Sequence, residues 1–315
     1  MDGEKFRYWW NKARYYRKLY LNWLGVLLNR ALRRDRIRVV LRGSGTEGTC
    51  TPDCVAKIAY VFTFAPWDPK HLYFKDGRLF YKDFELGDDA SWLNAALMDC
   101  GFIREGSVYY NPKLGVKFRA VNWAVYTTFC AGEYEADVRG REVVDIGANI
   151  GDTPVYFASL GAKHVYAFEP VPNIYQIALE HVKMNGVEDR VTLINGAAGA
   201  KDGEMLVPAS VDLLQSGVFS ASNKGQVKVP VYSMAKIRGM VSDPYLLKMD
   251  CEGCEAEIIL NSELDFERLV FEAHYNITKV PHKKLLSRLA EQKYRCRSRL
   301  WLGYGVEIFE CEKGA

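Results

Sequence analysis

Two acidic residues and two glycines form a pattern suited to binding a nucleoside. A short apolar strand is predicted to end near Asp145, and the next predicted strand ends at Glu169. Between them, Gly147 and Gly151 allow the backbone to turn tightly and to approach a ligand that a Cβ atom would block. Because open α/β sheets bind ligands at the carboxyl ends of their strands, Glu169 is placed to accept two hydrogen bonds from a ribose diol.

The spacing of the glycines and the charges beside them favour one class of cofactor. A dinucleotide fingerprint requires G-x-G-x-x-G, so that helix N-terminal amides meet a pyrophosphate, whereas here three residues separate Gly147 from Gly151. Asp145 precedes the turn and Asp152 closes it, and two carboxylates would repel a diphosphate. They suit a cationic ligand with an amino group and a ribose, for which S-adenosylmethionine is the common candidate. The alternatives are a nicotinamide or flavin enzyme and a glycine turn that only packs.

A second group of polar residues follows two later strands. Asp250 and Glu252 come after a strand predicted at 245–249, and His274 lies just beyond one predicted at 268–272. Since these strands are expected to be neighbours, the three side chains should lie close together at the carboxyl ends of the two strands. As general bases they need pKa values brought towards neutrality by burial or by one another. As ligands, two carboxylates and a histidine suit a divalent cation. We take the three as catalytic candidates and assign none of them as a metal ligand. A divalent cation remains an alternative.

The same residues also have structural interpretations. Asp250 and Glu252 could cap the helix that is expected to begin near Glu255, or could pair with Lys248. A single histidine often has only structural hydrogen bonds, so the case for His274 depends on the predicted adjacency of the two strands.

The residues expected to bind the cofactor lie at the ends of the first three strands. They are Asp145, Gly147, Asn149 and Gly151 for its amino-acid part, Glu169 for the ribose, and Asn195, Gly196 and Ala197 for the adenine.

Strands and helices alternate regularly from residue 140 onwards, which predicts right-handed crossovers and a parallel sheet. The expected strands are 142–146, 165–168, 191–195, 245–249 and 268–272, with helices at 153–160 and 174–185. A stretch rich in Gly and Ser, 201–226, precedes a further strand at 227–232, and segments 295–298 and 306–311 are expected to close the sheet as an antiparallel hairpin.

Three segments of the chain carry a family resemblance: VVDIGANIGDTPVYFASLGAKHVYAFEPVPNIYQIALEHVKMNG, LINGAAG and LLKMDCEGCEAEIIL. They resemble the FkbM-type methyltransferases, within the class I S-adenosylmethionine-dependent group. The resemblance covers residues 132–272, including the segment GEYE, and residues 248–253 match the pattern K-[IM]-D-x-E-G. It implies an α/β fold with a Rossmann-like, mostly parallel sheet, and methylation of a hydroxyl group. Cys251 and Cys254 depart from the small or aliphatic residues expected there.

The N-terminal part has a different composition, and three domains are predicted: a basic aromatic helix at 1–38, an α+β N-terminal cap at 39–130, and the S-adenosylmethionine-binding domain at 131–315. Segment 1–38 holds eleven Lys or Arg residues against three acidic ones. Its aromatic residues either pack on the folded body, or lie on an anionic membrane surface, or contact nucleic acid. The apolar stretch Leu24 to Leu28 is too short for a membrane span.

The elements expected in the N-terminal cap are a hairpin, a helix and a strand. Asp76-Gly77 predicts a hairpin that pairs 72–74 with 79–81. Residues 91–100 are predicted to form a helix, and residues 116–125 are predicted to form a strand.

Eight cysteines in 315 residues do not indicate a disulfide-dense secreted scaffold, and the chain is expected to be cytoplasmic, or peripheral at a membrane. Cys50 and Cys54 lack a second pair with histidines nearby, which disfavours a zinc site. Cys251 and Cys254 are interpreted as a buried structural pair, with a redox-active pair or a disulfide as alternatives.

The favoured function is O-methylation of a sugar, glycolipid or secondary metabolite. The alternatives are a nucleic-acid methyltransferase that uses the basic helix, which the absence of an N-P-P-Y-type motif disfavours, and a non-catalytic nucleoside-binding module at a membrane.

Overall fold

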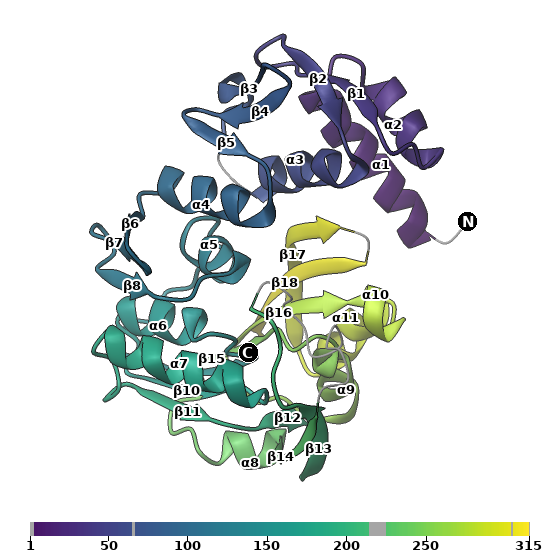
Figure 1. The fold of residues 1–315 in the computed structure, drawn as a ribbon. Helices are drawn as coiled ribbons and strands as arrows, with labels where there is room; N and C mark the ends of the chain where they lie inside the picture. The colour runs from purple at the N-terminus through teal and green to yellow at the C-terminus, as the bar shows by residue number, and fades with distance from the viewer. Residues whose placement is uncertain (1–2, 65–66, 214–224, 304, 315) are drawn as a thin grey trace. The chain divides into compact units, whose positions relative to one another are not determined.

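The chain divides into two compact units, residues 1–100 and 101–315. The computed structural model (Figure 1) describes residues 3–64, 67–213, 225–303 and 305–314. The boundary predicted near residue 130 falls inside the second unit. No helix among the described residues has both the length and the apolar character needed to cross a membrane.

The first unit contains short helices and small antiparallel sheets. Its elements are α1 (Gly3–Leu19), α2 (Trp23–Ala31), β1 (Ile37–Val40), β2 (Glu47–Cys50), α3 (Pro52–Phe64), β3 (Leu72–Lys75), β4 (Arg78–Tyr81), β5 (Phe84–Leu86) and α4 (Asp89–Asp99). The single helix expected over 1–38 is therefore two helices and the start of a strand. Tyr20 forms an isolated bridge with Leu41, and Asn22 hydrogen-bonds backbone atoms of Arg38 and Val40. These contacts end the first helix.

The hairpin predicted from Asp76-Gly77 is confirmed. Strands β3 and β4 pair antiparallel, and both turn residues have positive φ, 50° and 74°, as a two-residue hairpin turn requires. The helix predicted over 91–100 is α4. Tyr16 on α1 and Tyr20 directly after it are both buried, so part of the aromatic side of this segment packs inward.

The second unit begins with a three-stranded sheet and a helix. They are β6 (Ile103–Glu105), β7 (Val108–Asn111), β8 (Val116–Phe118) and α5 (Trp123–Phe129). The strand predicted over 116–125 was wrong beyond Phe118. Asn122 accepts a hydrogen bond from the amide of Ala124 at 3.1 Å, so its side chain caps and begins a helix there instead.

The main sheet has seven strands in the order β11-β10-β9-β15-β16-β18-β17. The strands are β9 (Glu142–Ile146), β10 (His164–Phe168), β11 (Val191–Ile194), β15 (Leu246–Met249), β16 (Arg268–His274), β17 (Tyr294–Gly303) and β18 (Val306–Lys313). The first five are parallel to one another, and β18 is antiparallel to both of its neighbours. The predicted α/β fold and its closing hairpin are confirmed.

Helices cover both faces of this sheet. They are α6 (Asp152–Ser159), α7 (Pro172–Met184), α8 (Met234–Arg238), α9 (Cys254–Asn261), α10 (Tyr275–Thr278) and α11 (His282–Glu291). Helices α8, α9 and α11 contribute to one apolar core with the sheet, and α6 and α7 contact β10 and β11. In Figure 1 α6 and α7 lie side by side in front of these strands.

Alternation along the strands decides which residues face the site. Leu247 and Phe271 belong to the apolar core under α8, α9 and α11. Successive side chains of a strand point to opposite faces, so Lys248 and Glu272 lie on the other face. Asp145 lies directly beside Lys248, because β9 and β15 pair in that register.

A second small sheet follows strand β11. It consists of β12 (Ala197–Gly199), β13 (Gly203–Pro208) and β14 (Gln226–Ser233), in the order β12-β14-β13. Part of the predicted insertion at 201–226 is thus the strand β13, and its residues 214–224 lie outside the described residues.

Cysteines are joined in pairs in both units. Cys251 is joined to Cys254 at the start of α9, and Cys296 to Cys311 across β17 and β18. Cys50 is joined to Cys54. The pair Cys251–Cys254 is therefore a disulfide, the alternative to the interpretation favoured from the sequence.

Gly147 shows how tightly the loop between β9 and α6 packs on the sheet. It has φ +85°, and a Cβ atom there would lie 1.8 Å from the carbonyl oxygen of Asp250. The glycine is thus required by the protein backbone itself. At Gly186, φ is +62° but a Cβ atom would meet nothing within 4 Å.

We expect Gly147→Ala to destabilise the chain much more than Gly186→Ala. Both substitutions place a side chain in the left-handed region, which costs about 1–2 kcal/mol. Only the first also forces the Asp250 carbonyl to move, which should add about 2 kcal/mol or more. Urea denaturation of the two variants beside the parent chain measures the difference in the free energy of unfolding. Equal losses would contradict the packing explanation.

Candidate functional site

The loop between β9 and α6 is held by the carboxylate of Glu169. Its Oε2 accepts a hydrogen bond from the amide of Asn149 at 3.0 Å, and its Oε1 accepts one from the amide of Val171 at 2.8 Å. Asn149 has φ 47°, a conformation that Asn tolerates better than most residues. Burial raises the pKa of Glu169 to about 8. Glu169 lies at the end of β10 as predicted, and it also fixes the backbone of the loop.

Asp145 is fully buried and points at a lysine of the adjacent strand. Its Oδ1 lies 2.9 Å from Nζ of Lys248, and its Oδ2 accepts a hydrogen bond from Thr153 at 2.5 Å. Lys248 also donates to the carbonyl of Gly147 at 2.7 Å. Burial opposes the charge of Lys248, but Asp145 and Asp250 raise its pKa above the ordinary value. The side chain of Asp145 therefore fixes the floor of the loop.

A second buried acid, Asp152, begins helix α6. Its Oδ2 accepts a hydrogen bond from Thr128 at 2.9 Å, whereas its buried Oδ1 has no hydrogen-bond partner among the described residues. Burial raises the pKa of Asp152 to about 7. Such a carboxylate oxygen suits a cationic or hydrogen-bond-donating ligand, since an unpaired buried polar group is costly.

The residues predicted to border the adenine follow β11. Nδ2 of Asn195 donates to the carbonyls of Glu169 and Pro170, at 2.9 and 3.1 Å. At Gly196, a Cβ atom would lie 2.7 Å from the ring of Tyr232. Asn195 thus holds the end of β10, while Ala197 is largely buried at the start of β12.

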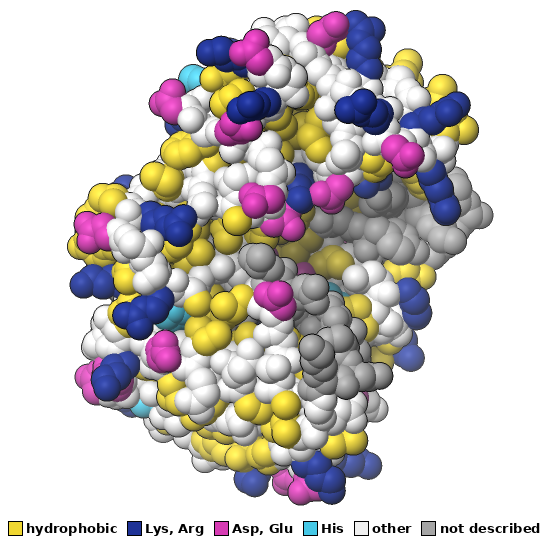
Figure 2. All heavy atoms as spheres, in the orientation of Figure 1, with side chains coloured by type: hydrophobic (Ala, Val, Ile, Leu, Met, Phe, Trp, Pro, Cys, Tyr) yellow, Lys and Arg dark blue, Asp and Glu magenta, His cyan; other side chains and the backbone are white. Residues whose placement is uncertain are grey.

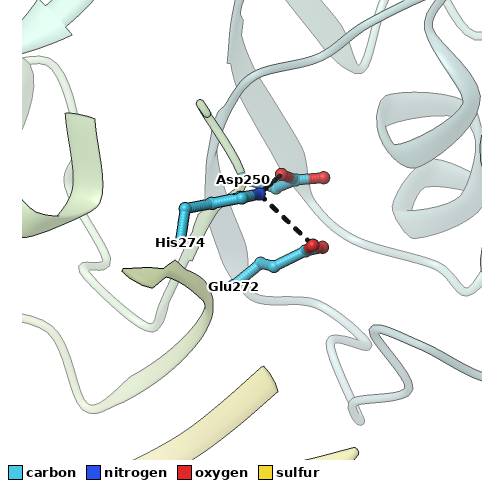
Figure 3. A group of neighbouring side chains, drawn as sticks. All are labelled: Asp250, Glu272 and His274. Atoms are coloured by element: carbon cyan, nitrogen blue, oxygen red, sulfur yellow. Dashed lines mark ion pairs between the residues drawn. The ribbon is translucent and has the colours of Figure 1, made fainter. Parts of the chain in front are cut away.

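The three catalytic candidates meet at the ends of β15 and β16. We call Asp250, Glu252, Glu255, Glu272 and His274 the His274 cluster. Nε2 of His274 lies 3.3 Å from Glu272 and 3.9 Å from each of Asp250 and Glu252. Figure 3 shows the imidazole pointing between Asp250 and Glu272.

The other ring nitrogen of His274 is held by a fully buried carboxylate. Nδ1 lies 3.0 Å from Oε1 of Glu255, which also accepts the backbone amide of His274 at 3.1 Å. Oε2 of Glu255 accepts the amide of Gly253 at 2.9 Å. Glu255 therefore sets the orientation of the ring and leaves Nε2 facing the three other acids.

These neighbours determine the charge states in the cluster. Burial opposes a charged imidazole, but hydrogen bonds to Glu255 and Glu272 raise the pKa of His274 to about 12. Burial and the charge of Asp250 raise the pKa of Glu252 and of Glu272 to about 7. His274 is therefore an imidazolium at neutral pH, and the two glutamates are in the range of general bases.

Besides Glu255, two more residues of the site were not predicted from the sequence. The hydroxyl of Tyr134 donates to Oδ2 of Asp250 at 2.9 Å, and Glu133 is buried with a pKa raised well above its usual value by burial and by Glu272. Both belong to the segment GEYE, which carried part of the family resemblance. The resemblance of that segment was the one indication of these residues in the sequence. No local pattern could indicate the contact, because 116 residues separate Tyr134 from Asp250.

The structural roles considered for Asp250 and Glu252, capping the next helix or pairing with Lys248, are not observed among the described residues. Helix α9 has Gly253 at its N-cap and no side-chain cap hydrogen bond, so neither Asp250 nor Glu252 caps it. Lys248 forms its ion pair with Asp145. Among the described residues, Asp250, Glu272 and His274 place three potential ligand atoms within 4.8 Å of one another. The arrangement can accept a proton, bind a cation or bind a cationic group.

Comparisons with known proteins match this chain to methyltransferases. Residues 145–296 match the model of the methyltransferase FkbM domain. A probable histone-arginine methyltransferase of Arabidopsis thaliana is 32% identical over 190 residues, which are 53% of this chain and 34% of that protein. Protein arginine N-methyltransferase 6 of Xenopus tropicalis is 31% identical over 81 residues, 26% of this chain and 22% of that protein.

The chain thus spans about a third or less of the length of these curated relatives. Among solved structures, methyltransferase FkbM from Methylobacillus flagellatus is 15% identical, with a TM-score of 0.38, and the match covers 82% of this chain and 60% of that one. Residues 145–296, just under half of the chain, thus match the methyltransferase FkbM domain.

Proposed function

We propose that this chain is an S-adenosylmethionine-dependent methyltransferase whose acceptor is a hydroxyl of a small molecule, sugar or glycolipid. The observation that supports the proposal best is the direct contact between the loop 147–151 and the His274 cluster. Nζ of Lys248 donates a hydrogen bond to the carbonyl of Gly147. The carbonyl of Asp250 lies so close to Gly147 that a Cβ atom there would be 1.8 Å from its oxygen. A cofactor on the loop and an acceptor in the cluster would therefore be neighbours, as alignment for group transfer requires.

The buried acids beside the loop fit this cofactor. Asp152 offers a buried oxygen without a partner among the described residues, and the pKa of Glu169 is raised to about 8 by burial. A nearby cation stabilises the charged form of a carboxylate. We therefore assign Asp152 to the amino group of the cofactor and Glu169 to its ribose. Gly147, Asn149 and Gly151 form the backbone of that subsite.

Two further assignments complete the cofactor subsite. Asn195, Gly196 and Ala197 border the adenine, because they follow the strand next to the one that ends at Glu169. Asp145 acts indirectly, by holding Lys248 and hence the carbonyl of Gly147.

The His274 cluster supplies the proton acceptor. The bound cofactor provides a methyl group on a sulfonium, and the acceptor hydroxyl must lose its proton as it attacks. Glu252 is suited to take this proton, because its side chain is 31% exposed and its pKa is raised to about 7. Asp250 orients the acceptor and is itself held by Tyr134. His274, as an imidazolium, keeps the carboxylates together.

A cation bound by the cluster would assist a hydroxyl acceptor. Two carboxylates and an imidazole form a suitable ligand set for a divalent ion, and Glu255 behind Nδ1 of His274 resembles the carboxylate that often supports a metal-bound histidine. Such an ion would bind the acceptor oxygen and lower its pKa. Because His274 is protonated without it, the ion must displace that proton.

A nitrogen acceptor is the second candidate, and the charge of the site favours it. Asp250, Glu252 and Glu272 surround one imidazolium, so the cluster carries excess negative charge when its acids are ionised. An amine or guanidinium would neutralise that charge without a metal ion.

The cofactor assignment is tested by calorimetric titration with S-adenosylmethionine, S-adenosylhomocysteine and NAD. We expect the first two to bind and NAD not to bind. Glu169→Gln should weaken S-adenosylmethionine binding by about 1–3 kcal/mol, the range for a lost hydrogen bond to a charged group. The exposed Glu188→Gln is the matched control. Binding of NAD alone would overturn the proposal, and unchanged affinity in folded Glu169→Gln would remove that residue from it.

The assignment of the base predicts the pH dependence of methyl transfer. With a pKa of about 7, Glu252 is mostly protonated below neutrality, so kcat should rise with pH and level off above about 8. Glu252→Gln should lower kcat by about 10²–10⁴-fold and abolish this rise. Glu188→Gln should retain both. A rise that persists in Glu252→Gln would assign the proton transfer to another group.

The two acceptor classes differ in their response to metal ions. For a hydroxyl acceptor we expect Mg²⁺ or Mn²⁺ to stimulate transfer, EDTA to abolish it, and Asp250→Asn to lose Mn²⁺ binding in calorimetry while Glu188→Gln keeps it. Transfer to amine or guanidine acceptors that is indifferent to EDTA would instead establish the nitrogen candidate. Radiolabelled S-adenosylmethionine with the two acceptor sets measures both.

A further inference from the structure

The helix α2 exposes a row of leucines instead of a charged face. Leu21, Leu24, Leu28 and Leu32 are 50%, 65%, 60% and 58% exposed. Leu24 and Leu28 are four residues apart within α2 and so lie on one side of the helix, while Leu21 and Leu32 lie just outside its two ends. An exposed helix face in a water-soluble unit normally carries charged or polar residues, so this row of four leucines, the leucine row, requires an explanation.

The other side of α2 is already used for packing. Val26 is fully buried, and the guanidinium of Arg30 donates to the hydroxyl of Tyr16 on α1 at 2.5 Å. Asn29 donates to the carbonyl of Gly25 within the helix. The side turned towards α1 is therefore fixed, and the leucine row is on the side left to the surroundings.

Basic residues are concentrated in the sequence on both sides of the leucine row. Between Trp9 and Arg36 the chain has eight Lys or Arg residues and one acidic residue, Asp35. Arg33, Arg34 and Arg36 follow α2 directly and are exposed. Figure 2 shows dark-blue basic side chains beside yellow hydrophobic ones over the region of α1 and α2.

We propose that the leucine row docks α2 in the interface of an anionic lipid bilayer, with the neighbouring arginines on lipid headgroups. Apolar side chains that enter the acyl boundary and basic residues at headgroup level are the two contributions that hold interfacial helices. Each basic residue near an anionic surface strengthens binding about fivefold. The charge complementarity selects this occupant over a second copy of the chain, since the same arginines would repel one another across such a dimer.

The test is co-sedimentation of the full chain with vesicles of phosphatidylcholine, alone or with one-third phosphatidylglycerol. We expect binding to the anionic vesicles only, weakened by salt. Leu24→Ser with Leu28→Ser should lower the partition coefficient about tenfold. The control is Leu206→Ser, at an exposed leucine on β13.

Two double variants that each remove two positive charges distinguish docking through α2 from attraction by the overall positive charge of the chain. Arg33→Gln with Arg34→Gln should weaken binding, whereas Lys283→Gln with Lys284→Gln, at exposed positions on α11, should not. Absence of binding to anionic vesicles, or an equal loss in the controls, would overturn the proposal. So would salt-sensitive RNA binding without vesicle binding, or a dimer that the leucine substitutions convert to a monomer without affecting lipid binding. Cofactor titration of the same variants keeps this result separate from that of the proposed function.

Discussion

The buried ion pair between Asp145 and Lys248 connects the loop that follows β9 with the strand that leads to the His274 cluster. It joins neighbouring residues of β9 and β15 at the centre of the sheet, and through Gly147 it reaches the loop that follows β9. A buried pair gains little net stability over apolar residues, but losing one partner leaves an uncompensated charge that costs about 3–5 kcal/mol. Its role is thus to fix one arrangement: a displaced Lys248 would leave Asp145 unpaired and release the carbonyl of Gly147.

The same pair explains why so many acids are tolerated nearby. Lys248 lies with its ammonium 5.1 Å from the ring centre of Tyr134, and Tyr134 in turn donates to Asp250. The lysine therefore offsets charge on the cofactor side, while the His274 imidazolium offsets charge on the acceptor side. Without these two cations, the pKa values of the acids at the ends of β9, β15 and β16 would be raised further, because burial disfavours their ionised forms.

The sequence was sufficient for those features that depend on alternation and strand adjacency. Strand β9 was predicted with its observed limits, and the approach of Asp250 to His274 followed from the expected neighbourhood of two parallel strands. It was insufficient where a side chain reaches across the fold. That Lys248 pairs with Asp145 depends on the register of two strands far apart in the sequence, and no local pattern encodes a register. Helix α5 was missed because one capping residue, Asn122, overrode the apolar, β-branched character of the residues after it.

The two glycines of the loop show how a correct motif can have an incomplete explanation. From the sequence, both were expected to leave room for a ligand, whereas in the structure protein backbone occupies that room. The carbonyl of Asp250 lies beside Gly147, and at Gly151 a Cβ atom would lie 3.0 Å from the Cα of Ala178. Close packing and ligand binding are connected, however. Because Gly147 lets the loop rest on the residue that follows β15, the elements assigned to cofactor and acceptor meet through backbone contacts. Their separation is then set by the hydrogen-bonded sheet and not by flexible side chains.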